Sequence, residues 1–386
     1  MGGSELRIVL ALGTTQTLAW ASSYYLPAIL ADSIARDLGV SSNWVFGAFS
    51  GALVVSALIG PRVGRQIDAV GGRPLLSISS VVFALGLALL GASANVVSLA
   101  AAWLVLGAGM GMGLYDAAFA TLGRIYGNSA RRAITGITLI AGFASTVGWP
   151  LSAWGLDTIG WRNTCFAWAA AHLVLGLPLN LFFLPSTPSH TSRAEDPASP
   201  AHVAIDRNMI LLAVAFASAW TVTSAIAAHL PRMLEAAGAT AVQAVAAGAL
   251  IGPAQVAARV FEAGLMKRFH PLVSARLSCV THPMGVVVLL ASGGGVAASA
   301  FALLHGAGNG ILTIARGTLP LAIFGPVNYG YRLGILGAPS RMTQALAPLA
   351  FGFLLEGMGQ RVFLVSSALS LVALGALFAL RRTAPP

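Results

Sequence analysis

The stretch that decides the fold is the loop "GRQIDAVGGRP" at residues 64–74. It is polar and glycine-rich, and it joins two long apolar runs, residues 43–63 and 74–93. Each run is about 20 residues long, the length that a helix needs to cross the hydrocarbon core of a bilayer. The loop therefore predicts a tight turn between two membrane-spanning helices.

The composition extends this interpretation to the whole chain. Of the 386 residues, 57% are hydrophobic and 9% are charged, and the mean hydropathy is +0.81. A soluble protein of this length needs more charge on its surface, and the apolar runs lack the alternation of barrel strands. The net charge of +10 is spread over short loops, so we exclude nucleic-acid binding. Cys165 and Cys279 both lie in apolar runs and indicate neither a disulfide framework nor a metal site.

The sequence thus predicts an all-α integral membrane protein with twelve membrane-spanning helices. No convincing cleavage site follows Arg7, so the N-terminal segment is interpreted as a retained first helix. The predicted spans are residues 6–30, 43–63, 74–93, 97–122, 133–156, 162–184, 207–232, 241–262, 272–292, 296–321, 333–356 and 361–380.

A polar, Pro- and Ser-rich stretch separates the sixth predicted span from the seventh. Such a composition is typical of a flexible linker. We therefore expect an N-terminal six-helix bundle at residues 1–184, a cytoplasmic linker at residues 185–206 and a C-terminal six-helix bundle at residues 207–386.

The basic residues predict the orientation. With the N-terminus inside, sixteen of the 22 lysines and arginines fall in inside segments and four in outside segments, while Arg316 and Arg341 fall within spans. Such a bias follows the positive-inside rule. Both termini are expected in the cytoplasm, and the chain is expected to be a multi-pass protein of the inner (plasma) membrane.

The two halves also resemble each other. A shift of 199 residues places "GAGMGMG" at 107–113 on "GAGNGIL" at 306–312, and Arg162 on Arg361. Six predicted spans separate the paired elements, so the repeats have the same orientation in the membrane. Two parallel six-helix repeats are an architecture of secondary transporters.

The opening loop carries Gly64, Asp68, Gly71 and Arg73 in the spacing G-x-x-x-D-x-x-G-x-R. With this motif, the twelve predicted spans and the repeat, the whole chain resembles the major facilitator superfamily. The resemblance implies two bundles that rock about a midplane cavity lined by the first, fourth, seventh and tenth helices. The stretch "ARVFEAG" at 258–264 resembles the bacterial monocarboxylate and oxalate/formate branch.

The motif residues are predicted to form a conformational latch at the inside face. Gly64 allows two helices to approach closely, and Asp68 can accept hydrogen bonds from backbone N–H groups or from Arg73. The alternative is that Asp68 and Arg73 only cap and anchor helix ends. In the second half the motif is degraded, and only Arg259 and Glu262 keep a comparable spacing.

Three charged side chains lie within predicted spans, where ionisable groups usually face the bundle interior or a wet cavity. Asp116 is predicted to be a protonatable coupling site or a gate partner, with a structural hydrogen bond as the alternative. Arg316 is nearly the repeat mate of Asp116 and either faces the cavity or snorkels to the headgroups. Arg341 lies about 13 Å deeper along its helix than Arg332 and needs an anion, either a substrate carboxylate or an acidic side chain.

Further polar residues share helix faces with these arginines. His305, Asn309 and Arg316 fall on one face of the tenth predicted span, and Gln344 shares the face of Arg341. A packed core histidine is the alternative for His305.

The first predicted span carries Gln16, Trp20 and Tyr24, and the seventh carries Trp220 and Ser224. Aromatic side chains with hydrogen-bonding tips suit a cavity wall that binds a partly apolar molecule. Anchoring at the membrane interface is the alternative for Trp20 and Tyr24.

The predicted function is secondary transport by alternating access. Because basic residues outnumber acidic ones within the spans, we expect a small organic anion as substrate, with proton coupling through Asp116 or His305 and exchange without protons both open. A broad-specificity drug efflux antiporter is the main alternative, and a non-transporting sensor or an intramembrane enzyme are weaker ones. No cofactor motif or metal-ligand spacing is found, so we expect no catalytic residues, metal or cofactor. The proton gradient is one possible energy source for transport. We also expect the protein to be a monomer.

Overall fold

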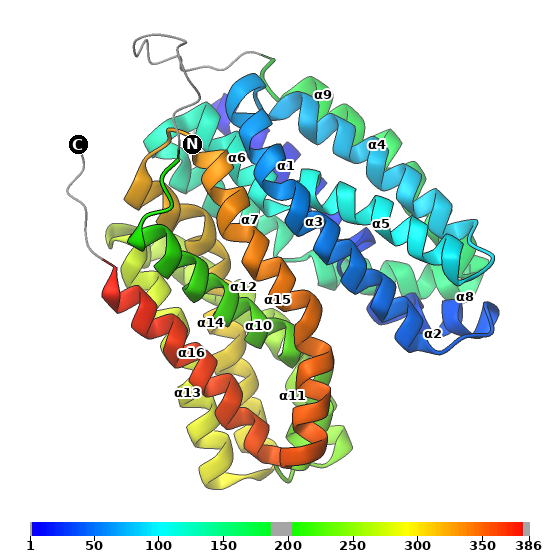
Figure 1. The fold of residues 1–386 in the computed structure, drawn as a ribbon, viewed down its shortest axis with the longest axis vertical. Helices are drawn as coiled ribbons and strands as arrows, with labels where there is room; N and C mark the ends of the chain where they lie inside the picture. Colours follow the sequence, from blue (N-terminus) through cyan, green and yellow to red (C-terminus); the bar gives the residue numbers. More distant parts are fainter. Residues whose placement is uncertain (1, 187–202, 381–386) are drawn as a thin grey trace. The chain divides into compact units, whose positions relative to one another are not determined.

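The computed structural model describes residues 2–186 and 203–380, and within these residues it is helical throughout and has no strand (Figure 1). The predicted all-α class is confirmed. Eight segments of the described chain are long and apolar enough to cross a membrane. Two of them, Val96–Phe183 with 88 residues and Tyr329–Ala379 with 51, are longer than one crossing needs. The number of twelve spans stays a prediction.

The chain divides into two compact units. The first consists of Met1–Ala204 and Phe324–Ala338, and the second of Ile205–Ile323 and Pro339–Pro386. The helix α15 (Tyr329–Met358) accordingly begins in the first unit and ends in the second. Most of the predicted linker, residues 187–202, lies outside the described residues, and the predicted domain boundaries stay predictions.

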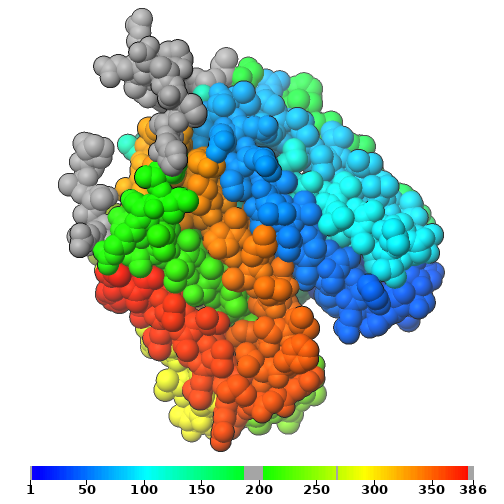
Figure 2. Space-filling model, in the orientation of Figure 1, coloured from blue at the N-terminus to red at the C-terminus, as the bar shows by residue number. Residues whose placement is uncertain are grey.

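The first unit is a helical bundle in which α3 and α4 both pack extensively against α5, and α1 packs against α7 and α8. Figure 2 shows α3, α4 and α5 close-packed on one face. Phe83, Trp103 and Phe119 are completely buried at its core. Its elements are α1 (Gly3–Ser22), α2 (Pro27–Asp37), α3 (Ser42–Val70), α4 (Gly72–Gly91), α5 (Val96–Gly113), α6 (Tyr115–Tyr126), the 3₁₀ turn Gly127–Ala130, α7 (Arg131–Ala141), α8 (Ala144–Ala171), the π-helix His172–Gly176 and α9 (Leu177–Phe183).

In the second unit α16 packs against both α10 and α13. Phe301, Phe363 and Ile226 belong to its buried apolar core. Its elements are α10 (Arg207–Ala236), α11 (Ala241–Ala249), α12 (Ile251–Gly264), the 3₁₀ turn Met266–Arg268, α13 (Pro271–Ser292), α14 (Gly294–Phe324), the later part of α15, the 3₁₀ turn Gly359–Arg361 and α16 (Val362–Ala379).

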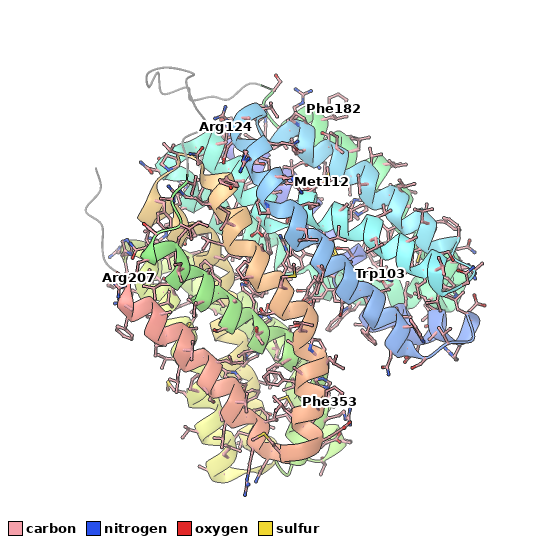
Figure 3. All side chains as sticks on the ribbon, viewed as in Figure 1. Trp103, Met112, Arg124, Phe182, Arg207 and Phe353 are labelled. Atoms are coloured by element: carbon pink, nitrogen blue, oxygen red, sulfur yellow. The ribbon has the colours of Figure 1, made fainter. Side chains whose placement is uncertain are left out.

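Large apolar side chains also cover the outside of both units. Phe182 and Phe353, labelled in Figure 3, are 77% and 67% exposed. Exposed apolar surface on this scale is unfavourable in water but is expected for helices in contact with lipid.

Local sequence signals explain several helix ends. Asn95 and Ser98 form a capping box at the start of α5, and Thr240 and Gln243 form one at the start of α11. Gly71 separates α3 from α4 with a φ of +85°, a conformation that glycine adopts without a steric penalty.

The fourth predicted span, residues 97–122, is not one helix. It breaks at Leu114, whose ψ of −174° is extended, so that α5 ends at Gly113 and α6 begins at Tyr115. Glycines recur at every second position from Gly107 to Gly113, and glycine weakens a helix interior. The amide of Gln16, on α1, donates to the carbonyl of Gly113 over 2.6 Å and satisfies a carbonyl that the broken helix leaves without an N–H partner.

Other predicted boundaries also differ. The first predicted span, residues 6–30, ends at Ser22, and a separate helix starts at Pro27, because proline is well tolerated at a helix start. In contrast, the predicted gap at residues 157–161 agrees with the structure, because the non-helical backbone of Gly160, with a φ of +79°, separates two helical segments within α8.

Candidate functional site

Asp116 lies in the first turn of α6 and is 7% exposed. The N-cap position of this helix is Leu114, whose side chain cannot cap it. A carboxylate near a helix N-terminus is stabilised by the partial positive charge of that end. The isolated acid in an apolar stretch therefore marks the beginning of a new helix, which the break at Leu114 creates.

Asp116 also lines a small cavity of about 10 Å³ within the first unit. The other lining residues are small or apolar and come from α3, α5, α6 and the beginning of α15. They include Gly60, Gly64, Gly111, Gly330 and Gly334. The cavity places the Asp116 carboxyl next to the segment of α15 that belongs to this unit.

Asp68 caps the beginning of α15. Its two carboxylate oxygens accept hydrogen bonds of 2.8 Å each from the backbone N–H groups of Gly330 and Tyr331. These N–H groups lie in the first turn of the helix, where they have no partner within the helix. Among the described residues, no hydrogen bond or ion pair joins Asp68 to Arg73. The guanidinium of Arg65 lies 4.2 Å from the ring centroid of Tyr331 and adds a cation–π contact.

Glycines allow α3 to approach this part of α15. A Cβ atom at Gly64 would collide with the carbonyl of Gly330, and one at Gly334 would meet the backbone of Gly60 at 2.5 Å. Backbone contacts this close are possible only where side chains are absent. Gly64, Asp68 and Gly71 thus all serve the geometry around the α3–α4 turn and the start of α15.

The aromatic residues predicted on the first span cluster in the first unit. Trp20 lies 5.1 Å from Tyr24 and 5.0 Å from Tyr115 between ring centroids. Tyr24 also contacts Phe49 edge-on at 5.4 Å. Trp20 therefore connects α1 with the first residue of α6, next to Asp116.

In the second unit, the structure brings predicted site residues of α10 and α14 together. The guanidinium of Arg316 lies 5.4 Å from the ring centroid of Trp220, and the Asn309 Oδ1 atom accepts a 3.3 Å hydrogen bond from the hydroxyl of Thr223. The hydroxyl of Ser224 donates to the backbone carbonyl of Gln344 over 3.0 Å, which ties α10 to α15.

Both Arg316 and Arg341 are 7% exposed, and Gln344 is equally buried. Arg341 and Gln344 lie in the part of α15 that belongs to the second unit. The guanidinium groups of Arg316, on α14, and Arg341, on α15, are therefore both buried in this unit.

His305 is directed away from this group. Its Nδ1 atom lies 3.0 Å from Nδ1 of His282, on α13, and its ring is stacked on Phe301. Nε2 of His282 in turn contacts the hydroxyl of Ser366, on α16, at 2.9 Å. His305 therefore packs against α13, whereas Asn309 and Arg316 contact α10.

The second-half motif residues are buried on α12. Arg259 lies 3.5 Å from the hydroxyl of Thr313 and 3.4 Å from Oε1 of Gln255. Glu262 is 1% exposed and accepts from the hydroxyl of Ser274 over 3.4 Å. Arg259 thus contacts α14 through Thr313, and Glu262 contacts α13 through Ser274.

Sequence reasoning missed two features. The contacts of His282 with His305 and Ser366 could not be predicted from nearby sequence, because these residues are 23 and 84 positions away. The alternating glycines before Leu114 could have indicated the helix break there. The apolar pattern alone did not, because it continues across the break and predicts one helix.

The family model described as the Major Facilitator Superfamily matches residues 12–304. A protein of Thermoproteus tenax, described as an uncharacterized 38 kDa protein in a 23S RNA operon, is 27% identical over 355 residues, which cover 92% of this chain and 90% of that protein.

Solved structures of the same fold include three transporters. The transporter FucP in the outward conformation has a TM-score of 0.76 at 16% identity, over 97% of this chain and 99% of FucP. The proton:xylose symporter XylE has a TM-score of 0.79 at 14% identity, over 97% of this chain and 94% of XylE. The human organic anion transporter MFSD10 has a TM-score of 0.71 at 16% identity, over 97% and 99%.

These similarities establish the fold, and the family match covers most of the chain. The predicted resemblance to the superfamily is confirmed, while the monocarboxylate branch stays a prediction. The chain belongs to the Major Facilitator Superfamily, and it is a multi-pass membrane transporter rather than an enzyme.

Proposed function

We propose that this transporter carries small organic anions by secondary transport, with Arg316 and Arg341 as the groups that bind the substrate's negative charge. The observation that carries the proposal is the burial of both guanidinium groups in the second unit. A charged side chain within a membrane-spanning segment is costly and usually marks a substrate or ion pathway.

The balance of buried charge supports an anion. Among the described residues of the second unit, the buried charged side chains, histidines aside, are Arg259, Arg316, Arg341 and Glu262. Three cations against one anion leave an excess of positive charge in a medium of low dielectric constant, which favours binding of a negatively charged molecule.

The side chains around Arg316 fit a carboxylate with an attached organic group. A guanidinium can hold a carboxylate through two parallel hydrogen bonds. The indole of Trp220, beneath Arg316, offers an apolar face to the rest of the substrate, and Asn309 and Thr223 offer hydrogen-bonding atoms. Gln344, Ser224, Gln16, Trp20 and Tyr24 remain proposed contact residues.

Asp68 and Asp116 have proposed roles in the transport cycle. The cap that Asp68 forms on α15 would exist in one conformation and be broken in another, so that Gly64, Asp68, Gly71 and Arg73 act as a latch. Asp116, buried at the start of α6, would bind and release a proton if transport is proton-coupled. Arg259 and Glu262 are weaker candidates for a role in the same cycle.

The test is counterflow of labelled carboxylates in proteoliposomes that contain the purified full-length chain. Arg341→Gln should abolish counterflow while the protein still inserts and purifies normally. Arg361→Gln is the matched control, since Arg361 belongs to the same unit but is exposed. Unchanged anion counterflow in both Arg341→Gln and Arg316→Gln would exclude this binding site.

Efflux of planar aromatic compounds is the second candidate function. The cluster around Trp20 and Tyr115 supports it, because stacked aromatic faces bind apolar and cationic ring systems. A thermal-stabilisation screen separates the two functions: stabilisation by organic anions and not by cationic drugs supports the first. We place the transporter as a monomer in the inner (plasma) membrane.

A further inference from the structure

A second cavity of about 10 Å³ lies within the first unit, at the π-helix His172–Gly176. A π-helix inside a helical segment is rare and is frequently found at functional sites. The volume is about that of one water-sized sphere. The polar residues that line the cavity come from five elements and are Thr15, Ser79, Ser80, Gly113, His172 and Asn180.

The hydrogen-bond donors of this lining are already used. The hydroxyls of Ser79 and Ser80 and the amide nitrogen of Asn180 all donate to the backbone carbonyl of Leu76, at 2.8, 3.3 and 3.0 Å. The hydroxyl of Thr15 donates to a carbonyl of its own helix at 3.1 Å. Thr15, Ser79 and Asn180 therefore have oxygen lone pairs to offer the cavity, because their hydrogens are engaged. The Ser80 hydroxyl, which has the longest of these contacts, can offer a lone pair when its hydrogen turns toward Leu76.

Asn180 supplies the clearest sign of a missing partner. Its side chain is 3% exposed, and its nitrogen also donates to the hydroxyl of Ser80 over 3.1 Å. Its Oδ1 atom has no hydrogen-bond partner. A buried acceptor without a partner destabilises the folded state, so a bound species that the amide oxygen can coordinate would relieve this cost.

His172 adds another acceptor. The hydroxyl of Ser22 donates to the carbonyl of Leu18 over 2.8 Å, so its hydrogen is not available to the imidazole. The 2.8 Å contact between this hydroxyl and Nε2 of His172 then requires Nε2–H to donate. In the neutral ring, Nδ1 consequently carries a lone pair.

Two of these acceptors approach a common point. A Cβ atom added at Gly176 would lie 3.3 Å from the Ser80 hydroxyl oxygen and 3.5 Å from Nδ1 of His172. The Cδ2 atom of Leu18 lies 3.3 Å from the same point, so a methyl group at residue 176 would fit tightly against all three side chains.

The break in the fourth predicted span completes the lining. The carbonyl of Gly113 is at the C-terminal end of α5, and this end of a helix carries a partial negative charge. In transporters, the C-terminal ends of interrupted helices and unwound carbonyls are sites that coordinate sodium ions. The carbonyl accepts from Gln16 and keeps a second lone pair.

We propose that this cavity binds a monovalent cation, sodium, through the oxygen atoms of Thr15, Ser79, Ser80, Gly113 and Asn180. A water molecule could donate to only two of these acceptors, whereas a cation can contact all five oxygen atoms at once. A divalent ion normally requires carboxylate ligands, and the lining contains none. The site goes beyond anion transport, because it is complete within the first unit and needs no substrate.

The direct test is thermal unfolding of the purified full-length protein at constant ionic strength, with sodium chloride replacing choline chloride. Tm should rise with sodium in a saturable manner, as expected for a ligand that binds only the folded state. Binding of radioactive sodium should saturate at about one ion per chain, the number that a single site holds.

Ser80→Ala should raise the sodium concentration for half-saturation about tenfold or more, because it removes a ligand oxygen. Ser77→Ala is the matched control. It removes a hydroxyl from the same helix that is also buried, at 6% exposure, but that does not line the cavity. Gly176→Ala should also abolish the sodium response, since its methyl group would occupy space beside Ser80 and His172.

The proposal would be overturned if Tm were the same in sodium chloride and in choline chloride. It would also be overturned if Ser80→Ala and Gly176→Ala left the rise of Tm with sodium unchanged. These measurements contain no organic substrate. Failure of anion counterflow would therefore leave the sodium site intact, and absence of sodium binding would leave the anion site of the second unit intact.

Discussion

The two units place corresponding residues in different surroundings. Trp20 and Trp220 are 200 positions apart, and so are Asp116 and Arg316. In the first unit Trp20 packs on Tyr115, and the helical segment that bears Asp116 is broken. In the second unit Trp220 lies beneath Arg316, and α14 runs unbroken from Gly294 to Phe324. Within one residue of the 199-residue repeat, both units therefore have a tryptophan at the same place, Trp20 and Trp220. The charge at the other position changes from the negative Asp116 to the positive Arg316.

The difference in the helix break has a chemical cause. The residue 200 positions after Gln16 is Phe216, which is 1% exposed in the second unit. A phenylalanine cannot donate to a released carbonyl, whereas the amide of Gln16 does so at Gly113. The second unit also has a bulkier residue, Leu312, where the 199-residue shift places Gly113. One unit is thus built to tolerate an interrupted helix and the other to keep a continuous one.

Among changes that compare the two units, removing the charge of Arg316 should have the largest effect. Arg316→Gln eliminates a charge-assisted interaction worth about 1.5–3 kcal/mol, so kcat/KM for anion uptake should fall about 10- to 100-fold. Asp116→Asn, at the corresponding position of the first unit, should leave anion binding in place and remove the pH dependence of transport in proteoliposomes. Equal loss of anion binding in both variants would show that the two positions do not have separate roles.

Gly64→Ala should have the next largest effect, a loss of stability. The added methyl group collides with the carbonyl of Gly330, and such overpacking costs about 1–3 kcal/mol, which thermal unfolding in detergent would measure as a lower Tm. Gly47→Ala is the control on the same helix, because a Cβ atom there meets nothing within 4 Å. A Tm for Gly64→Ala equal to that of the control would disprove close approach of α3 and α15.

Gln16→Leu should cost about 1–2 kcal/mol, because it removes the donor to the Gly113 carbonyl. Denaturant unfolding measures the loss. Phe216→Leu, the same replacement at the corresponding position of the second unit, removes apolar volume but no hydrogen bond. A crosslink or spin-label distance across Leu114 should change in Gln16→Leu and stay constant in Phe216→Leu.

The smallest effect is expected at Thr223. Thr223→Val removes the 3.3 Å hydrogen bond to Asn309 and keeps the side-chain shape, so stability should fall by about 0.5–1.5 kcal/mol. Anion affinity should change by less than in Arg316→Gln. An affinity loss as large as that of Arg316→Gln would instead make Thr223 a direct substrate contact.

Several site features could be predicted from sequence because their signals are local. The loop motif predicted a turn between two helices, which the structure has at Gly71, whereas Asp68 lies in the last turn of α3 because this helix continues to Val70. The repeat related Asp116 to Arg316. The partner of Asp68 could not be predicted, since the N–H groups that it accepts from lie 262 and 263 positions away. The spacing of His305 and Arg316 predicted that they share one face of a helix. It did not predict that His305 would contact α13 and Arg316 would contact α10, because spacing does not show which neighbouring helix a side chain meets.

The sequence by itself determined that the chain is an all-α membrane protein with the loop motif of its superfamily, and it predicts a six-plus-six repeat. Run length, hydropathy and motif spacing are properties of short segments, so they need no folded structure. Only the tertiary structure decided that the helix before Asp116 breaks, that His282 holds His305, and that Asn180 has an unpartnered oxygen in a cavity. These properties depend on donors and acceptors from helices far apart in sequence, which only packing brings within hydrogen-bond distance.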